Sequence, residues 1–191
     1  ISNLGDQSAM AHLRPYLQRH PLDYSASIQL VFRMSRLGLL SRKATASADG
    51  IPKRLMFFWD ETNRPPSIDR LIRSWPAANP DYAVEIFDDV TAKAWLEQEF
   101  GARHARAFAR AQNAAMKSDF FRLCYLFRSG GIYADCDDRC RAPLDDWLEG
   151  RDAVLYQENH LSFAVANNFM ACAPAQPWLG HAIEHALLAL E

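Results

Sequence analysis

The residues best suited to chemistry lie in one stretch of the chain, KSDFFRLCYLFRSGGIYADCDD, which runs from Lys117 to Asp138. Asp135 and Asp137 are separated by one residue, so an extended backbone would point both carboxylates to the same side. Adjacent carboxylates repel unless a cation or a hydrogen-bond donor lies between them, and Mg²⁺ or Mn²⁺ favours such oxygen ligands. The pair therefore indicates a divalent-metal site, although a solvated acidic turn explains most isolated D-x-D sequences.

A second polar pair precedes these carboxylates. Apolar residues at helical spacing from Met116 to Phe127 predict a helix whose apolar arc faces the core, and Asp119 falls inside that arc. A buried carboxylate needs a partner, and Arg122 is three residues away, where helical side chains meet. The pair is either a structural ion pair or a polar notch that faces a ligand.

The elements around this stretch should place the carboxylates at the edge of a sheet. Gly130 and Gly131 can adopt the left-handed conformation that ends helices, and a short strand is expected at residues 132–134. Asp135 follows that strand at once. In open α/β sheets, ligands bind beyond the carboxyl ends of the strands, which is where this loop would lie.

From Ile51 onward the chain alternates between strand-like and helix-like segments, which predicts an α/β fold with a mixed sheet flanked by helices. Ser67 and Thr91 are expected to cap two of the helices. The expected strands are 54–59, 82–87, 132–134, 153–157 and 163–171, and the expected helices are 67–75, 91–100, 103–112, 116–129 and 177–191. Residues 1–50 are expected to form a separate extension of two helices, interrupted at Pro21, and a linker at 41–50.

Composition excludes several classes of protein. A net charge of -2 argues against a dedicated nucleic-acid binder, and no apolar run approaches the roughly 20 residues of a transmembrane segment. The four cysteines do not form the framework of a disulfide-stapled domain, so reduced thiols are expected. We expect a cytoplasmic protein, with peripheral membrane association as the alternative.

The Lys117–Asp138 stretch resembles the signature of the DXD-containing sugar-binding region of glycosyltransferase family 32, S-D-x-x-R-x-x-x-L-x-x-x-G-G-x-Y-x-D-x-D. The fixed positions are filled here by Ser118, Asp119, Arg122, Leu126, Gly130, Gly131, Tyr133, Asp135 and Asp137. The similarity extends to IPKRLMFFW, NPDYAVEIFDD and NNFMACAPAQPWL, so it covers about residues 51 to 180. Met56 stands where the family usually has His.

The resemblance implies a GT-A fold in a catalytic domain at 51–191. It also implies a metal-dependent, retaining hexosyltransferase that moves a sugar from a UDP- or GDP-sugar to a hydroxyl of a glycan, a lipid-linked acceptor or a protein, as in polysaccharide biosynthesis. The implied cofactor is Mn²⁺ or Mg²⁺. The family usually continues beyond the point that corresponds to Glu191, so a minimal, a truncated and an elsewhere-completed domain remain open.

Carried over by position, Asp137 would be the direct metal ligand and Asp135 would contact donor hydroxyls and the metal shell. Asp119 and Arg122 would hold the transferred sugar. Three further residues are expected to bind the donor: Trp59, Tyr133 and Asn168. Trp59 matches the family's aromatic residue that stacks on the donor base. Asn167 and Asn168 are either sugar or acceptor contacts or satisfied loop amides.

Other functions remain as alternatives. A zinc site built from Cys136, Cys140 and a histidine lacks a second ligand pair at a recognisable interval. A phosphotransferase would need a glycine-rich phosphate loop, which is not found. A catalytically inactive GT-A-like module that binds a nucleotide sugar or a protein is the main rival to an enzyme. No covalent nucleophile stands out, which favours a front-face displacement.

Overall fold

The computed structural model describes residues 3–20, 23, 25–26, 29–30, 33–34, 37, 50–156 and 165–191. The chain divides into two compact units, one formed by Ile1–Ala44 with Tyr156–Ala166, and the other by Thr45–Leu155 with Asn167–Glu191. The first unit contains α1 (Asn3–Arg19), where the sequence predicts its first helix. Most of the predicted second helix and linker lies outside the described residues.

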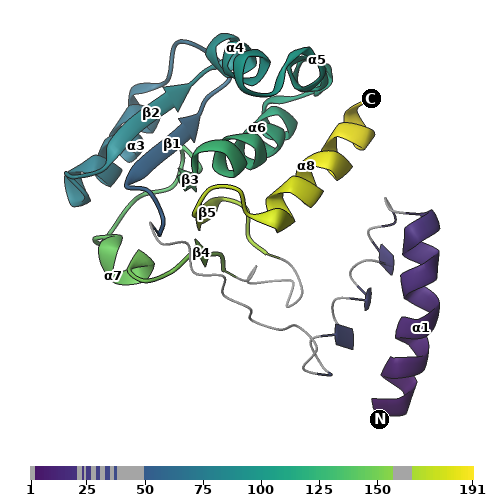
Figure 1. Cartoon of the computed structure of the whole chain (residues 1–191). Coiled ribbons are helices and arrows are strands. Elements are labelled where there is room, and N and C mark those ends of the chain that lie inside the picture. The colour runs from purple at the N-terminus through teal and green to yellow at the C-terminus, as the bar shows by residue number, and fades with distance from the viewer. Residues whose placement is uncertain are drawn as a thin grey trace. The chain divides into compact units, whose positions relative to one another are not determined.

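Five strands of the second unit form one mixed sheet in the order β2-β1-β3-β5-β4 (Figure 1). The strands are β1 (Arg54–Phe58), β2 (Ala83–Phe87), β3 (Gly131–Ala134), β4 (Ala153–Val154) and β5 (Phe169–Cys172). β1 pairs in parallel with β2 and β3, whereas β5 runs antiparallel to β3 and β4. The carboxyl ends of β1, β2 and β3 therefore share one edge with the amino end of β5. The predicted α/β architecture with a mixed sheet is confirmed.

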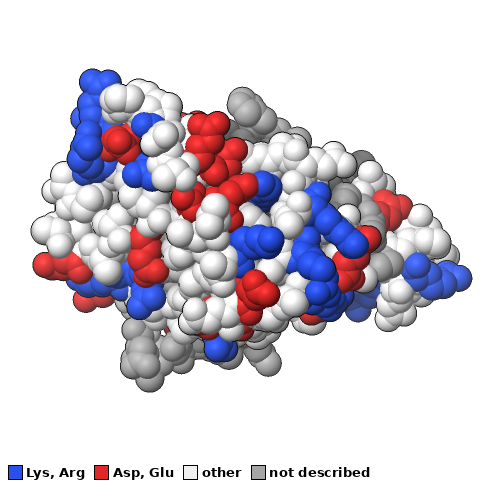
Figure 2. All heavy atoms as spheres, turned by 90° about the horizontal axis from the view of Figure 1, so that it is seen from above, with Lys and Arg blue, Asp and Glu red and all other residues white. Residues whose placement is uncertain are grey.

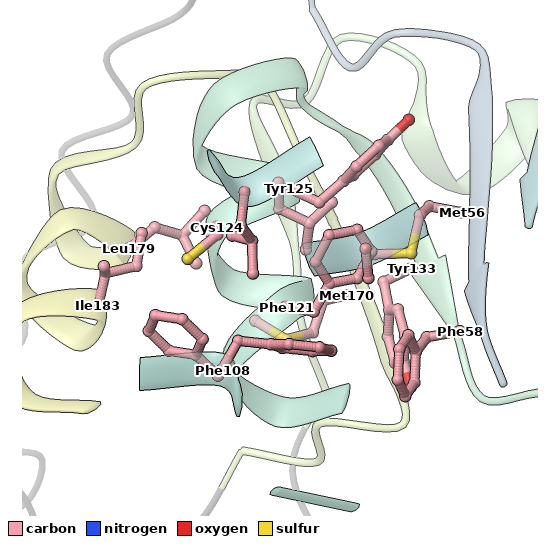
Figure 3. Packing of buried hydrophobic residues seen from close by; sticks show 14 of the residues in the cluster. Met56, Phe58, Phe108, Phe121, Cys124, Tyr125, Tyr133, Met170, Leu179 and Ile183 are labelled. Carbon is pink, nitrogen blue, oxygen red and sulfur yellow. The ribbon is translucent and has the colours of Figure 1, made fainter. Parts of the chain in front are cut away.

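Alternating side chains of the strands separate two hydrophobic layers. Met56 and Phe58 of β1 pack with Tyr133 and with the inner sides of four helices, as Figure 3 shows. These helices are α4 (Asp89–Phe100), α5 (Ala102–Arg110), α6 (Ala114–Ser129) and α8 (Pro177–Leu190). Leu55 and Phe57 of β1 point to the other face, where α3 (Pro66–Ala78) and α7 (Asp145–Leu148) cover the sheet.

Helix α6 crosses the larger of these layers and carries the predicted sugar-contacting residues. Asn113 caps it, because the side chain of Asn113 accepts a hydrogen bond from the backbone N–H of Met116 at 2.9 Å. The helix is buried along more than one apolar arc, since Ser118, Phe121 and Arg122 are buried together with Phe120, Cys124, Tyr125 and Leu126. Met116, which the periodicity placed in the core, is 37% exposed.

Several element boundaries differ from those predicted. Helix α3 begins at Pro66 with no side-chain cap from Ser67, because proline is well suited to the first helical position. The cap of α4 is Asp88, and Thr91 serves as the third helical residue of a capping box. β4 and β5 are shorter than the predicted strands, of which residues 157 and 163–164 lie outside the described part. None of the described helices is long and apolar enough to cross a membrane.

Two glycines set the spacing between α6 and β3. Both have positive φ, +62° at Gly130 and +101° at Gly131. A Cβ added at Gly131 would lie 2.8 Å from the backbone oxygen of Arg54, and one at Gly130 would lie 2.8 Å from Pro174. Only glycine allows the turn and lets β3 approach β1 this closely. The double glycine thus fixes where β3, and the carboxylates after it, begin.

Replacing Gly131 by alanine should therefore destabilise the fold. We expect Gly131→Ala to lower the free energy of unfolding in urea by about 2–4 kcal/mol, through backbone strain and the contact with Arg54. Gly101→Ala is the matched control, because Gly101 has a φ of +86° and nothing within 4 Å of its added Cβ. Equal losses in the two variants would show that close packing at Gly131 contributes nothing.

Candidate active site

A pocket of about 390 Å³ lies at the shared edge of the sheet, between the end of β1, the first turns of α6 and the loop after β3. It brings together Trp59, Arg122, Tyr133, Asp135 and Asp137 from the predicted set. Asp119 and Asn168 are not among its lining residues. The remaining lining residues are Phe58, Asp60, Ile68, Ala114, Ala115, Ser118 and Cys136.

The backbone between the two predicted metal ligands is a turn, not an extended strand. Cys136 and Asp137 form this turn, and the N–H of Asp138 donates to the backbone oxygen of Asp135 at 3.1 Å. The expectation of an alternating extended backbone was therefore wrong. Asp135 and Asp137 still line the same pocket, because the turn folds the chain back over it.

The two carboxylates differ in their surroundings. Asp135 is half-buried: it accepts a hydrogen bond from the Tyr133 hydroxyl and lies 3.5 Å from the Arg122 guanidinium. Burial raises the pKa of the Asp135 carboxyl above its usual value, against the opposing effects of Tyr133 and Arg122. Asp137 is exposed, and within the described residues it makes no hydrogen bond or ion pair. A cation at this loop would find one anchored carboxylate and one free carboxylate.

Arg122 is the most completely satisfied polar group of the site. Its side chain is 5% exposed, and the guanidinium lies over the Tyr133 ring at 4.1 Å from the centroid. Five oxygen atoms contact the guanidinium: the backbone oxygen of Ser118 at 3.2 Å, the Ser118 hydroxyl at 3.1 Å, Asp119 at 2.9 Å, Asp135 at 3.5 Å and the backbone oxygen of Asn167. Three of these contacts are hydrogen bonds and the two to Asp119 and Asp135 are ion pairs, so protein oxygens take the place of water around the buried charge.

Asp119 differs from the sequence-based expectation of a buried carboxylate. Its side chain is 51% exposed, and it pairs with Arg122 and accepts from the Asn167 amide at 3.0 Å. The buried member of the pair is Arg122. Burying the arginine requires several acceptors, which explains why Asp119, Ser118 and Asn167 gather around it. The sugar-holding role of Asp119 and Arg122 remains a prediction.

Tyr133 connects the helix to the carboxylates. Its hydroxyl lies 2.8 Å from the Ser118 hydroxyl and donates to Asp135. The phenol is buried, and burial raises its pKa, so it stays protonated and available as a donor. The sequence motif includes Ser118 without predicting its contacts, and the structure makes Ser118 a partner of both Arg122 and Tyr133.

Trp59 lies directly after β1 and forms a half-buried wall of the pocket. Its indole Nε1 is buried, and no hydrogen-bond partner reaches it from the described residues. A buried N–H without an acceptor is unfavourable by about 1–3 kcal/mol. The predicted stacking on a nucleotide base is not tested by this geometry.

Asn168 reaches the site through the register of β5. Ala134 pairs with Phe169 in the antiparallel ladder, so the residue before β5 lies beside the residue after β3. The backbone oxygen of Asn168 accepts from the N–H of Asp135 at 2.8 Å, and its side chain donates to Asp138 at 2.8 Å. The sequence showed two asparagines, Asn167 and Asn168, within an expected strand. The strand register that brings Asn168 to the acidic loop could not be predicted from the sequence.

The thiols of the rival zinc site have other partners. Cys136 Sγ lies 3.1 Å from the backbone oxygen of Phe58, and burial raises its pKa to about 12. Cys140 Sγ lies 3.2 Å from the backbone oxygen of Ala142. Among the described residues, no group of three or more His, Cys, Asp or Glu side chains is placed to hold a metal ion. Any ion at Asp135 and Asp137 would need further ligands from outside the described residues.

The sequence of this region is similar to that of known glycosyltransferases. Residues 65–154 match the family described as a glycosyltransferase sugar-binding region containing the DXD motif. The chain is 28% identical over 120 residues to an initiation-specific alpha-1,6-mannosyltransferase of Candida albicans. This match covers 60% of this chain and 31% of that protein. The enzyme of the same name from Saccharomyces cerevisiae is 31% identical over 104 residues, 51% of this chain and 22% of that protein.

The fold is also that of a solved glycosyltransferase. The structure titled PaToxG Glycosyltransferase superposes with a TM-score of 0.63 at 17% sequence identity, over 97% of this chain and 71% of that one. This likeness confirms the predicted GT-A-like fold. The chain spans about a third or less of the length of the two mannosyltransferases it matches. The motif, the family match over residues 65–154 and the relatives together support a glycosyltransferase similar to family 32, with a DXD-containing sugar-binding region.

Proposed function

We propose that this chain carries the donor-binding site of a metal-dependent, retaining mannosyltransferase. The reaction would move a mannosyl group from a nucleotide-diphosphate sugar to an acceptor hydroxyl. Two relatives are named mannosyltransferases, which supports mannose as the transferred sugar. GDP-mannose is therefore the donor to test first. The acceptor would be a glycan, a lipid-linked molecule or a protein.

One observation carries the proposal: the unpaired Asp137 carboxylate shares a pocket with Asp135, Arg122 and Tyr133. An acidic turn that served only for solubility would not need a lining of buried aromatic and hydrogen-bonded groups. These polar atoms converge on a space of about 390 Å³, within the range of small-molecule sites. The pocket therefore has the size and the donors and acceptors to orient a nucleotide sugar.

The carboxylates fit the implied cation. Mg²⁺ and Mn²⁺ are commonly held by one or two carboxylates, with substrate phosphates and water completing the shell. A bound divalent cation would neutralise charge that develops on the leaving diphosphate. Asp137 would supply a free oxygen ligand, while Tyr133 and Arg122 hold Asp135 in place beside it. The Asp135 carboxyl, whose pKa burial raises, would be favoured in its charged form by such an ion.

The proposed retention of configuration follows from the resemblance to family 32 and is assigned to a front-face displacement, in which Asp60 and Asp137 of the pocket take no covalent part. Asp135 is engaged by Tyr133 and Arg122, and Ser118 by Arg122 and Tyr133. A front-face displacement needs no covalent intermediate, because the leaving phosphate itself can take the proton of the acceptor hydroxyl. The inactive-module alternative keeps the same pocket and differs only in turnover.

The first prediction concerns turnover and its dependence on Asp137. With a panel of nucleotide sugars and Mn²⁺, the protein should release nucleotide from at least one donor, with GDP-mannose the leading candidate. Asp137→Ala should lower the release rate about 100-fold or more, because charge stabilisation in the transition state is lost.

Asp146→Ala is the control, because Asp146 is exposed on α7 outside the pocket, and it should retain the wild-type rate. Absence of release with every donor, while nucleotide still binds, would favour the inactive module. Equal rates for Asp137→Ala and the wild type would contradict the proposed role of this carboxylate.

The second prediction concerns Tyr133 as a positioning residue. Tyr133→Phe removes the hydroxyl that donates to Asp135, so the affinity for donor and Mn²⁺ should fall about tenfold, consistent with the loss of a hydrogen bond to a charged group. The affinity can be measured by titration calorimetry with GDP-mannose and Mn²⁺.

Tyr125→Phe is a matched control, because the Tyr125 hydroxyl donates to Glu85 at 2.8 Å and Tyr125 does not line the pocket. Both variants should lose about 1–2 kcal/mol of unfolding free energy. Only Tyr133→Phe should lose affinity for the donor and Mn²⁺. A similar loss of affinity in Tyr125→Phe would show that general destabilisation, and not the Tyr133 hydroxyl, causes the effect.

A further inference from the structure

We propose that a second pocket beside the donor pocket binds a phosphate group of the acceptor. This pocket has a volume of about 450 Å³ and is lined by Ser67, Arg70, Leu71, Ser74 and Arg139. This inference rests on the proposed function, because the phosphate group is assigned to the acceptor of the proposed glycosyl transfer. The binding of phosphate itself can be tested without any turnover.

The two pockets share two walls. Helix α3 contributes Ile68 to the donor pocket and Ser67 and Leu71 to the second pocket. The loop after β3 contributes Asp137 to the first pocket and Arg139, two residues later, to the second. A molecule with its hydroxyl at the donor pocket can therefore extend along the same loop and α3 into the second pocket.

The residues on either side of Arg139 in the chain are hydrogen-bonded to side chains of α3. The indole N–H of Trp75 donates to the backbone oxygen of Asp138 at 3.2 Å, and the backbone N–H of Cys140 donates to the Ser74 hydroxyl at 3.0 Å. These bonds hold the backbone of Arg139 against the helix that carries Arg70. The two arginines thus line one pocket because of the fold, and not through a chance approach of two long side chains.

Neither arginine has a counter-charge in the described part of the chain. Arg70 and Arg139 are exposed and make no hydrogen bond or ion pair there, and the Ser67 hydroxyl also lacks a partner. The carboxylate beside Arg70, Asp69, is engaged by Arg64 at 2.9 Å. Two positive charges at one pocket repel, and an anion between them would turn this repulsion into attraction.

Phosphate is the anion that this set of groups fits best. Guanidinium groups present paired N–H donors that match phosphate oxygens, and a serine hydroxyl adds a further donor. Acidic groups concentrate instead at the neighbouring donor loop, so a nucleotide diphosphate and an acceptor phosphate would be held by different means. On the face viewed in Figure 2, Lys and Arg side chains lie among Asp and Glu side chains, and neither sign covers the face alone.

The test is a binding titration of the full chain with glycerol 1-phosphate, followed by amide chemical shifts, in the presence of excess GDP and diamagnetic Mg²⁺ to occupy the donor pocket. Glycerol is the uncharged comparison. A second arm uses vesicles of phosphatidylglycerol against vesicles of phosphatidylcholine, which separates a lipid head group from a soluble phosphoester. The variants are the double substitution Arg70→Gln with Arg139→Gln, and Arg73→Gln, an exposed arginine of the same helix that does not line the pocket.

We expect binding of glycerol 1-phosphate or of phosphatidylglycerol vesicles that weakens at least about tenfold in the double variant and is unchanged in Arg73→Gln. Labelled GDP should bind all three proteins equally with Mn²⁺. Absence of binding to both phosphate probes, or equal weakening by Arg73→Gln, would overturn the phosphate pocket. Absence of GDP binding with intact phosphate binding would count against the proposed donor site alone.

Discussion

Arg122 places a permanent positive charge in the core, and the site is arranged around its solvation. With 5% of its side chain exposed, it depends on protein oxygens in place of water, and it receives them from α6, from the loop after β3 and from the segment before β5. An arginine buried without these acceptors would be costly, so the three segments are held in one arrangement. The same contacts fix Asp135, while Asp137, one turn further on, stays free.

The need to surround the buried Arg122 with acceptors explains the separate roles of the motif residues. Gly130 and Gly131 set the distance between the helix that carries Arg122 and the strand that precedes Asp135. Tyr133 fills the space beneath the guanidinium and passes a hydrogen bond to Asp135. Residues separated along the sequence thus serve one purpose, which is to hold a half-buried carboxylate beside an exposed one at the edge of the sheet. Within the described part of the chain, the Asp137 carboxylate is thus left free at the pocket.

The sequence predicted what depends on local pattern and failed where long-range packing decides. The buried strand at β1, the double-glycine stop and the mixed α/β order follow from hydropathy and turn chemistry. Periodicity placed Asp119 in the core and left Arg122 as its partner, whereas α6 is buried on more than one side and the arginine is inside. The turn at Cys136 and Asp137 and the register of β5, which brings Asn168 beside Asp135, depend on pairings distant in sequence. The pocket lined by Arg70 and Arg139 could not be predicted either, because these residues are distant in sequence and line one pocket only in the fold.

The most direct test of this account compares the unfolding free energies of Arg122→Met and Arg128→Met. Both arginines lie on α6 and pair with a carboxylate, but the Arg128 side chain is 57% exposed in its pair with Glu99. Arg122→Met should cost about 3–5 kcal/mol because Ser118, Asp135 and Asn167 lose their donor, whereas Arg128→Met should cost no more than about 1 kcal/mol. Small and equal losses would contradict the account, because Arg122 would then be free to serve the ligand and would not hold the site together.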